Sequence, residues 1–153
     1  MSEDLLLKLE LLSDPALLCV VCAAMERLTE VFGFSAAECR SVTRAVDEAL
    51  TNIMRHAYGG QPGRPIEMIC RRLPKRRAAA GGGDGLEIVL CDQGPAVDPA
   101  KLRGRRLDEI KPGGLGLHFI RQSMDTVEFT RARGENWLRL IKYLPQAQES
   151  CNS

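Results

Sequence analysis

The chain has 153 residues, 44% of them hydrophobic and 27% charged, which suits a single domain with its own hydrophobic core. Its formal net charge is +1, so no overall field attracts it to nucleic acid or an anionic membrane. The N-terminus lacks the pattern of a signal peptide, and no apolar run approaches the length of a membrane span. We therefore expect a cytoplasmic protein that binds neither nucleic acid nor membrane directly.

The N-terminal third predicts a strand followed by a helix. Residues 5–12 alternate in polarity, although imperfectly, as a strand does. Asp14 is placed to cap a helix that has Pro15 at its first position, and Gly33 marks its end.

Two cysteines in this first helix form a C-x-x-C pair. Cys19 and Cys22 share a helix face, which favours two small buried hydrophobic side chains over a redox or metal role. The two histidines, His56 and His118, are not spaced to complete a zinc site with them. The six cysteines do not have the spacing of a disulfide framework, so we expect free thiols.

The second helix has the clearest start signal in the sequence. Ser35 and Glu38 form a capping box, and Phe34 and Cys39 occupy the positions of a hydrophobic staple. An apolar stripe of helical period follows, and we expect the helix to continue until Gly59.

The remainder predicts four strands and one more helix. A helix is expected over 115–124, and a hairpin turn at Arg133-Gly134. Strands are expected over residues 66–73, 86–91, 127–131 and 137–144. This order predicts an α/β sandwich of two layers, in which the helices pack on one face of a mixed, mostly antiparallel sheet. We expect one domain over 1–145 and a C-terminal tail over 146–153.

Three segments carry residues suited to nucleotide chemistry. The first is on the second helix, where Glu48 and Asn52 lie one turn apart along a border of the apolar stripe. The second is Asp92-Gln93-Gly94, where a carboxylate at the end of an apolar strand can accept a bond from a ligand amine. A glycine two residues later lets the backbone approach that ligand closely.

The third segment is Pro112-Gly113-Gly114-Leu115-Gly116-Leu117, at the start of a helix. Glycines there leave backbone N–H groups available at the positive end of the helix, which is a physical site for an anion. The segment lacks the Lys-Ser or Lys-Thr of a Walker A loop, and it does not follow a strand as a dinucleotide fingerprint does. Taken alone, each of the three segments also has an ordinary structural explanation.

In this order, however, the segments DEALTNIMRHAY, DQGPAVDP and GGLGLHFIRQSMD resemble the N-box and the two glycine boxes of the GHKL ATPase superfamily. Within it, the chain is similar to the anti-sigma-factor serine kinases of bacterial partner-switching systems, the RsbW and SpoIIAB family. The likeness extends from about residue 5 to residue 144. It implies the Bergerat fold, which agrees with the predicted order of elements.

The resemblance also implies roles for individual residues. Glu48 corresponds to the general base, Asn52 to the Mg²⁺ ligand, and Asp92 to the residue that binds the adenine amino group of ATP or ADP. Gly94 would let the base approach. The phosphates would be held by the glycine-box segment of Gly113, Gly114, Leu115, Gly116 and Leu117, and the loop between Gln93 and Gly113 would be the ATP lid, with Arg103, Arg105 or Arg106 meeting the γ-phosphate.

The chain differs from the family pattern at two places. Pro95-Ala96 follows the D-x-G where relatives often have a second glycine. The last strand pair of many relatives carries a Gly-Thr that assists adenine binding, whereas this chain has Gly134-Glu135-Asn136-Trp137, and no adenine role is assigned to that segment from the sequence.

The function that the resemblance implies is an ATP-dependent serine/threonine protein kinase that also acts as an anti-sigma regulator. Its substrate would be an anti-sigma-factor antagonist with a STAS domain, and its other partner a sigma factor or an equivalent regulatory protein. Relatives commonly form homodimers. The alternative is a binding module that senses ATP and ADP and sequesters a partner without transferring phosphate. The ATP-binding half of a histidine kinase is less favoured, because no phosphoacceptor helix precedes the domain.

Overall fold

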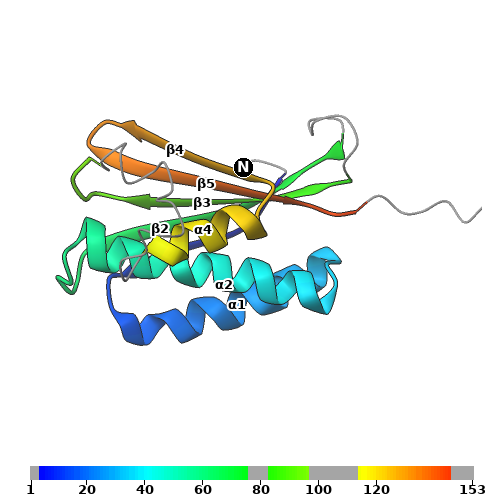
Figure 1. Cartoon of the computed structure of the whole chain (residues 1–153), viewed down its shortest axis with the longest axis horizontal. Helices are drawn as coiled ribbons and strands as arrows, with labels where there is room; N and C mark the ends of the chain where they lie inside the picture. Colours follow the sequence, from blue (N-terminus) through cyan, green and yellow to red (C-terminus); the bar gives the residue numbers. More distant parts are fainter. Residues whose placement is uncertain (1–3, 76–82, 97–113, 146–153) are drawn as a thin grey trace, which may run out of the picture.

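A computed structural model describes residues 4–75, 83–96 and 114–145. The described elements form two layers, with the helices gathered on one face of a five-stranded sheet (Figure 1). The sheet has the order β1-β2-β3-β5-β4, and each pair of neighbouring strands within it is antiparallel. The predicted sandwich is therefore confirmed, with a sheet that is antiparallel in all of its described pairings. The expected tail over 146–153 lies outside the described residues.

The strands lie close to their predicted positions. β1 (Leu5–Leu12) is an edge strand, and β3 (Gly85–Asp92) is central and buried along its whole length. The hairpin turn at Arg133-Gly134 is confirmed, since both residues have the positive φ angles, 54° and 77°, of a tight hairpin turn. The other strands are β2 (Pro65–Leu73), β4 (Thr126–Ala132) and β5 (Glu135–Tyr143).

The first helix differs slightly from its prediction. The Asp14 side chain accepts a bond from Ala16 N, but the next residues form a short 3₁₀ turn (Pro15–Leu17) before the α-helix α1 (Leu18–Phe32) begins. Cys19 is exposed and only Cys22 is partly buried, so the prediction of two buried side chains is wrong for Cys19.

The second helix, α2 (Ala36–Asn52), begins as predicted, with both hydrogen bonds of the Ser35–Glu38 capping box present. It does not continue as an α-helix to Gly59. After Asn52 the chain makes one turn of π-helix, Ile53–Ala57, closed by a bond from Tyr58 N to Ile53 O. Such π turns are rare and often occur at functional sites. The third α-helix, α4 (Gly114–Ser123), is where the sequence predicted it.

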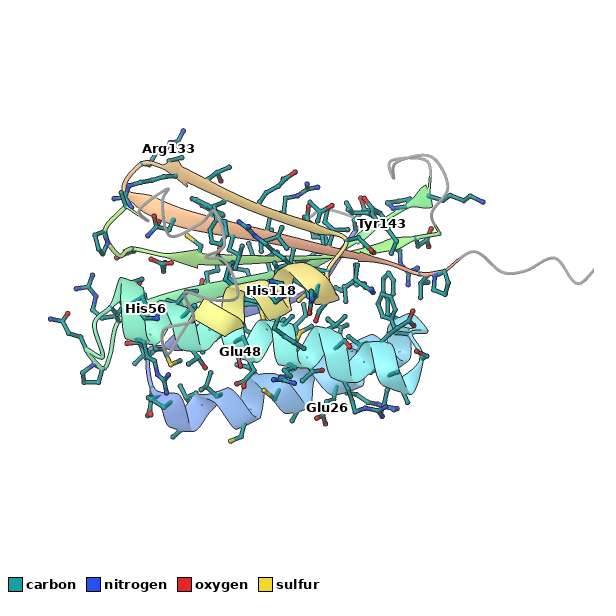
Figure 2. The ribbon with its side chains drawn as sticks, viewed as in Figure 1. Glu26, Glu48, His56, His118, Arg133 and Tyr143 are labelled. Carbon is teal, nitrogen blue, oxygen red and sulfur yellow. The ribbon has the colours of Figure 1, made fainter. Side chains whose placement is uncertain are left out.

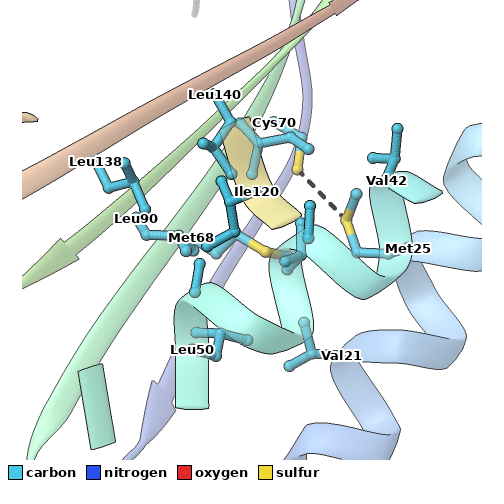
Figure 3. Close-up of a cluster of buried hydrophobic side chains, with 14 of the residues drawn as sticks. Val21, Met25, Val42, Leu50, Met68, Cys70, Leu90, Ile120, Leu138 and Leu140 are labelled. Atoms are coloured by element: carbon cyan, nitrogen blue, oxygen red, sulfur yellow. Dashed lines mark hydrogen bonds between the residues drawn. The ribbon is translucent and has the colours of Figure 1, made fainter. Parts of the chain in front are cut away.

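The hydrophobic core fills the space between the helices and one face of the sheet (Figure 3). Met68, Leu90 and Leu140 extend from three neighbouring strands and are fully buried. Met25 of α1 and Leu50 of α2 meet them from the helical layer. Burial of side chains of this size stabilises a fold by about 1.5–3 kcal/mol each, which explains how one amphipathic layer of helices is held on the sheet.

Candidate nucleotide site

The candidate site lies where α2, the start of α4 and the end of β3 meet. Figure 2 shows Glu48 on the side of α2 that faces α4. Glu48 and Asn52 are both half-buried, as expected for side chains at the border of the apolar stripe. The sequence prediction that they share one side of the helix is therefore consistent with their position.

A glycine allows α4 to approach these two side chains. A Cβ built on Gly116 would lie 2.7 Å from Oε2 of Glu48 and 3.6 Å from Nδ2 of Asn52. A side chain at position 116 would therefore displace the carboxylate. The close approach joins the first and third sequence motifs, which are separated by more than sixty residues, into one group.

The third motif is described only in part. Gly114 and Leu115 form the first turn of α4, Gly116 is buried beside Glu48, and Leu117 is half-buried. Gly113 and the arginines predicted for the lid lie outside the described residues. Since the first N–H groups of a helix lack partners within it, the start of α4 presents donors next to Glu48 and Asn52.

The second motif lies at the end of β3, on the core-facing side of the sheet. Asp92 is 5% exposed and follows the row of core residues that includes Leu90. Its Oδ1 accepts a bond of 2.8 Å from Gly94 N and one of 2.9 Å from Nδ2 of Asn136. These two donors satisfy one oxygen of the buried carboxylate and fix the direction of the side chain.

Gly94 is in a place where only a glycine fits. A Cβ there would lie 2.7 Å from Cβ of Ala57, 2.8 Å from the Ala57 carbonyl oxygen and 2.9 Å from Oδ1 of Asp92. Because two of these neighbours are backbone or short side chains, they cannot move aside at low cost. Gly94, which is predicted to let a ligand approach, lets the segment after β3 pack against the π turn after α2.

Tyr58 holds the residue between Asp92 and Gly94. Its hydroxyl accepts a bond of 2.8 Å from Gln93 N and donates to the carbonyl oxygen of Pro65. Burial raises the pKa of Tyr58, so the phenol keeps the proton that it donates. Tyr58 carried no signal of this role in the sequence beyond its place at the end of the second helix.

The described part of the chain does not place the C-x-x-C cysteines or the histidines in a group that could hold a metal ion. No group of three or more His, Cys, Asp or Glu side chains there could hold a metal ion. Cys22 donates to Oδ1 of Asp47 at 3.7 Å, and its pKa is raised to about 11, first by burial and then by that carboxylate. Its thiol therefore stays protonated at neutral pH and is a poor nucleophile.

The residues of the site suit a magnesium-bound nucleotide. The amide oxygen of Asn52 and the carboxylate of Glu48 are hard oxygen ligands of the kind that Mg²⁺ takes beside phosphate oxygens. The buried carboxylate of Asp92 suits a ligand that donates a hydrogen bond, and the start of α4 suits an anion.

Comparison with known proteins identifies the family of this chain. The sequence pattern of the histidine kinase-like ATPase domain matches residues 11–142, and the chain belongs to this family. The described part of the chain contains no helix that is long and apolar enough to cross a bilayer.

Curated relatives are named as protein kinases. The serine/threonine-protein kinase BtrW of Bordetella bronchiseptica is 32% identical over 107 residues, which cover 67% of this chain and 69% of that protein. The serine-protein kinase RsbW of Bacillus pumilus is 27% identical over 131 residues, which cover 80% and 76%. Among solved structures, the SiaB–SiaC complex of Pseudomonas aeruginosa contains a chain with the same fold, with a TM-score of 0.57 at 13% identity and coverage of 93% and 92%.

Asp92→Asn tests the adenine end of the site. The amide oxygen can still accept the bonds from Gly94 and Asn136, so the fold should be retained. The new NH₂ group is a donor and would meet the amine of the ligand, which is also a donor. A buried donor left without an acceptor costs about 1–3 kcal/mol or more of binding free energy. We expect calorimetry to show that ATP binding is nearly abolished while the melting temperature changes little. Unchanged ATP affinity would remove Asp92 from the site.

Proposed function

We propose that this chain binds ATP with Mg²⁺ and transfers the γ-phosphoryl group to a serine of a small STAS-type antagonist protein. The observation that carries the proposal is the close approach of Glu48 and Asn52 to the start of α4 at Gly116. This approach places a candidate base and a candidate metal ligand beside a helix start that is a candidate for binding phosphate. The names of the curated relatives support the same activity.

Each residue has a distinct part in this proposal. Glu48 would accept the proton of the incoming serine hydroxyl, and its place one turn from Asn52 puts it on the side of the helix where the metal-bound phosphates would lie. Asn52 would contribute its amide oxygen to the metal site. Bound Mg²⁺ would supply charge shielding for the phosphates, which together with positioning accounts for most of the catalysis in phosphoryl transfer.

We also propose that the protein acts in the cytoplasm as a partner-switching regulator, binding a sigma factor or an equivalent regulatory protein in addition to its antagonist. The similarity to the RsbW and SpoIIAB family supports these partners. The free thiols of the described cysteines, Cys19, Cys22, Cys39, Cys70 and Cys91, fit a reducing compartment.

A second copy of the chain is a further proposed partner, and the edge strand β1 supports it. Six of its eight residues are leucines, and Leu12 is 55% exposed. Val20 of α1, which lines a hollow of about 670 Å³ together with Leu9 and Leu12, is 60% exposed. An open, apolar edge of this kind pairs readily with another strand.

The sequence of β1 is complementary to itself. In an antiparallel pair with a two-fold axis at Leu9, Leu7 would lie opposite Leu11 of the second copy, and Lys8 opposite Glu10. The half-buried leucines would stay on the helical face of both sheets and the charges on the other face. This register pairs every charge of the strand with an opposite one.

Glu48→Gln tests the proposed base. The variant keeps the shape of the side chain but cannot accept a proton, so we expect phosphorylation of the antagonist to fall by roughly 10²–10⁴-fold while ATP still binds. The measurement is transfer of labelled phosphate to the cognate antagonist protein, with calorimetry for ATP. Full activity in the variant would exclude Glu48 as the base, and a large loss of ATP affinity would make it a binding residue. Wild-type protein that binds ATP but phosphorylates nothing would favour the sensor alternative.

Asn52→Ala tests the metal ligand. Because only the metal-bridged part of the affinity depends on the amide oxygen, we expect ATP binding to weaken more in Mg²⁺ than in EDTA. Calorimetry in the two buffers measures the difference. Thr51→Ala, on the same turn, is the control and should behave like wild type. An equal loss in both buffers would contradict the assignment of Asn52.

Charge reversal on β1 tests the second copy. We expect the wild-type chain to sediment as a dimer and Glu10→Lys as a monomer, because four lysines would then face one another across the strand pair. The double variant Lys8→Glu, Glu10→Lys restores opposite charges across the pair and places a lysine opposite Glu67 on β2, so the dimer should return. Glu128→Lys, on the other edge strand, is the control. A monomeric wild type, or a dimer that survives Glu10→Lys, would overturn this interface.

A further inference from the structure

A chain of polar contacts crosses three strands beside Asp92. Asn136 of β5 lies directly opposite Asp92 of β3, and Arg131 of β4 lies directly opposite Asn136. All three occupy the core-facing rows of their strands, beyond the last apolar residues. Asn136 is 6% exposed, so its amide must find its partners within the protein.

The amide of Asn136 makes bonds at both ends. Its Nδ2 donates to Oδ1 of Asp92 at 2.9 Å, to the Pro95 carbonyl oxygen at 2.9 Å and, at a longer 3.3 Å, to the Gly94 carbonyl oxygen. Its Oδ1 accepts a bond of 2.8 Å from Nη1 of Arg131, which also donates to the Gly94 carbonyl oxygen at 3.0 Å.

The chemistry of the neighbours determines which way the amide faces. A carboxylate and two carbonyls only accept, and a guanidinium only donates, so the reversed amide would meet acceptors with its oxygen and a donor with its NH₂ group. Arg131 therefore fixes the orientation in which Asn136 donates to Asp92. A threonine at this place would have a single hydroxyl proton and could not make the same set of bonds.

We infer that Asn136, oriented by Arg131, is the residue that positions Asp92 and the Gly94–Pro95 backbone for recognition of the adenine amino group. The inference rests on the proposed role of Asp92 in binding adenine. Asn136 donates to Oδ1 of Asp92 and to the carbonyl oxygen of Pro95. One side chain therefore holds both the carboxylate and the backbone after Gly94 in the segment proposed to bind the base. Asn136 and Arg131 are positioning residues and need not touch the ligand.

The test compares a nucleotide that has the 6-amino group with one that lacks it. ADP and inosine diphosphate share the sugar and phosphates, so a general loss of structure lowers the affinity for both. A residue that acts through Asp92 lowers the affinity for ADP selectively. The measured quantity is the ratio of the two dissociation constants, obtained by calorimetry in Mg²⁺ on the full chain.

We expect wild-type protein to prefer ADP and Asn136→Ala to lose about 5- to 50-fold in ADP affinity with little change for inosine diphosphate, as for loss of a hydrogen bond to a charged group. Asn136→Asp should lose the preference more completely, because it places a second carboxylate against Oδ1 of Asp92. Arg131→Met should reduce the preference less, since the amide remains but is no longer oriented. Arg27→Ala, on the exposed side of α1, is the matched loss of one arginine and should leave the ratio unchanged.

The two ways of failing are distinct. Wild-type protein that binds both nucleotides equally would overturn the role of Asp92 and the inference with it. A wild-type preference that Asn136→Ala keeps intact would overturn the inference alone and leave Asp92 in place. If Asn136→Ala does not fold, Asn136→Thr provides the second comparison: it retains one donor, and a preference equal to that of wild type would equally overturn a special role for the amide.

Discussion

The packing of α2 and of the π turn that follows it against two glycines is the constraint on which the candidate site depends. At one place Gly116 brings the start of α4 against Glu48, and at the other Gly94 brings the end of β3 against Ala57 in the π turn that follows α2. Neither approach leaves room for a Cβ. α2 is itself held by a fully buried stripe that includes Val42, Val46 and Leu50. The proposed phosphate end and the proposed base end of the site thus pack against one continuous helical segment, α2 with its π turn, and their separation is set by the stretch from Glu48 to Ala57.

The π turn explains how one helix serves both ends. An α-helix that continued beyond Asn52 would keep presenting residues at 100° intervals, and Tyr58 would follow that rotation. The wider turn over Ile53–Ala57 changes the phase by inserting an i→i+5 bond, and it delivers Ala57 to Gly94 and the Tyr58 hydroxyl to Gln93 N. No residue in the sequence signals such a turn, because nothing in IMRHA is incompatible with an ordinary α-helix. This is why the sequence predicted a continuous helix to Gly59.

Local signals in the sequence were sufficient for the fold and for part of the site. The capping box of Ser35 and Glu38, the glycine after α1 and the Arg133-Gly134 turn each act over a few residues, and each is where it was expected. Periodicity placed Glu48 and Asn52 at the border of the buried stripe. Asn136 and Arg131 could not be found in this way, because their contacts with Asp92 and with each other depend on how β3, β5 and β4 are paired. Asn136 lies 44 residues from Asp92 in the chain and becomes its neighbour only when β3 and β5 pair.

The contacts of the backbone after β3 also give a physical account of Pro95. A glycine there leaves the backbone free to change direction, whereas proline fixes φ and removes a donor. The lost N–H is of no consequence in this structure, because the segment is held through its carbonyl oxygens: Gly94 O by Arg131, and Pro95 O by Asn136. The fixed φ angle of Pro95 and the hydrogen bond from Asn136 to its carbonyl oxygen therefore both restrict the conformation of the Gly94–Pro95 backbone. In the proposed role of this segment in binding the base, that restriction would leave less conformational entropy to be lost on binding.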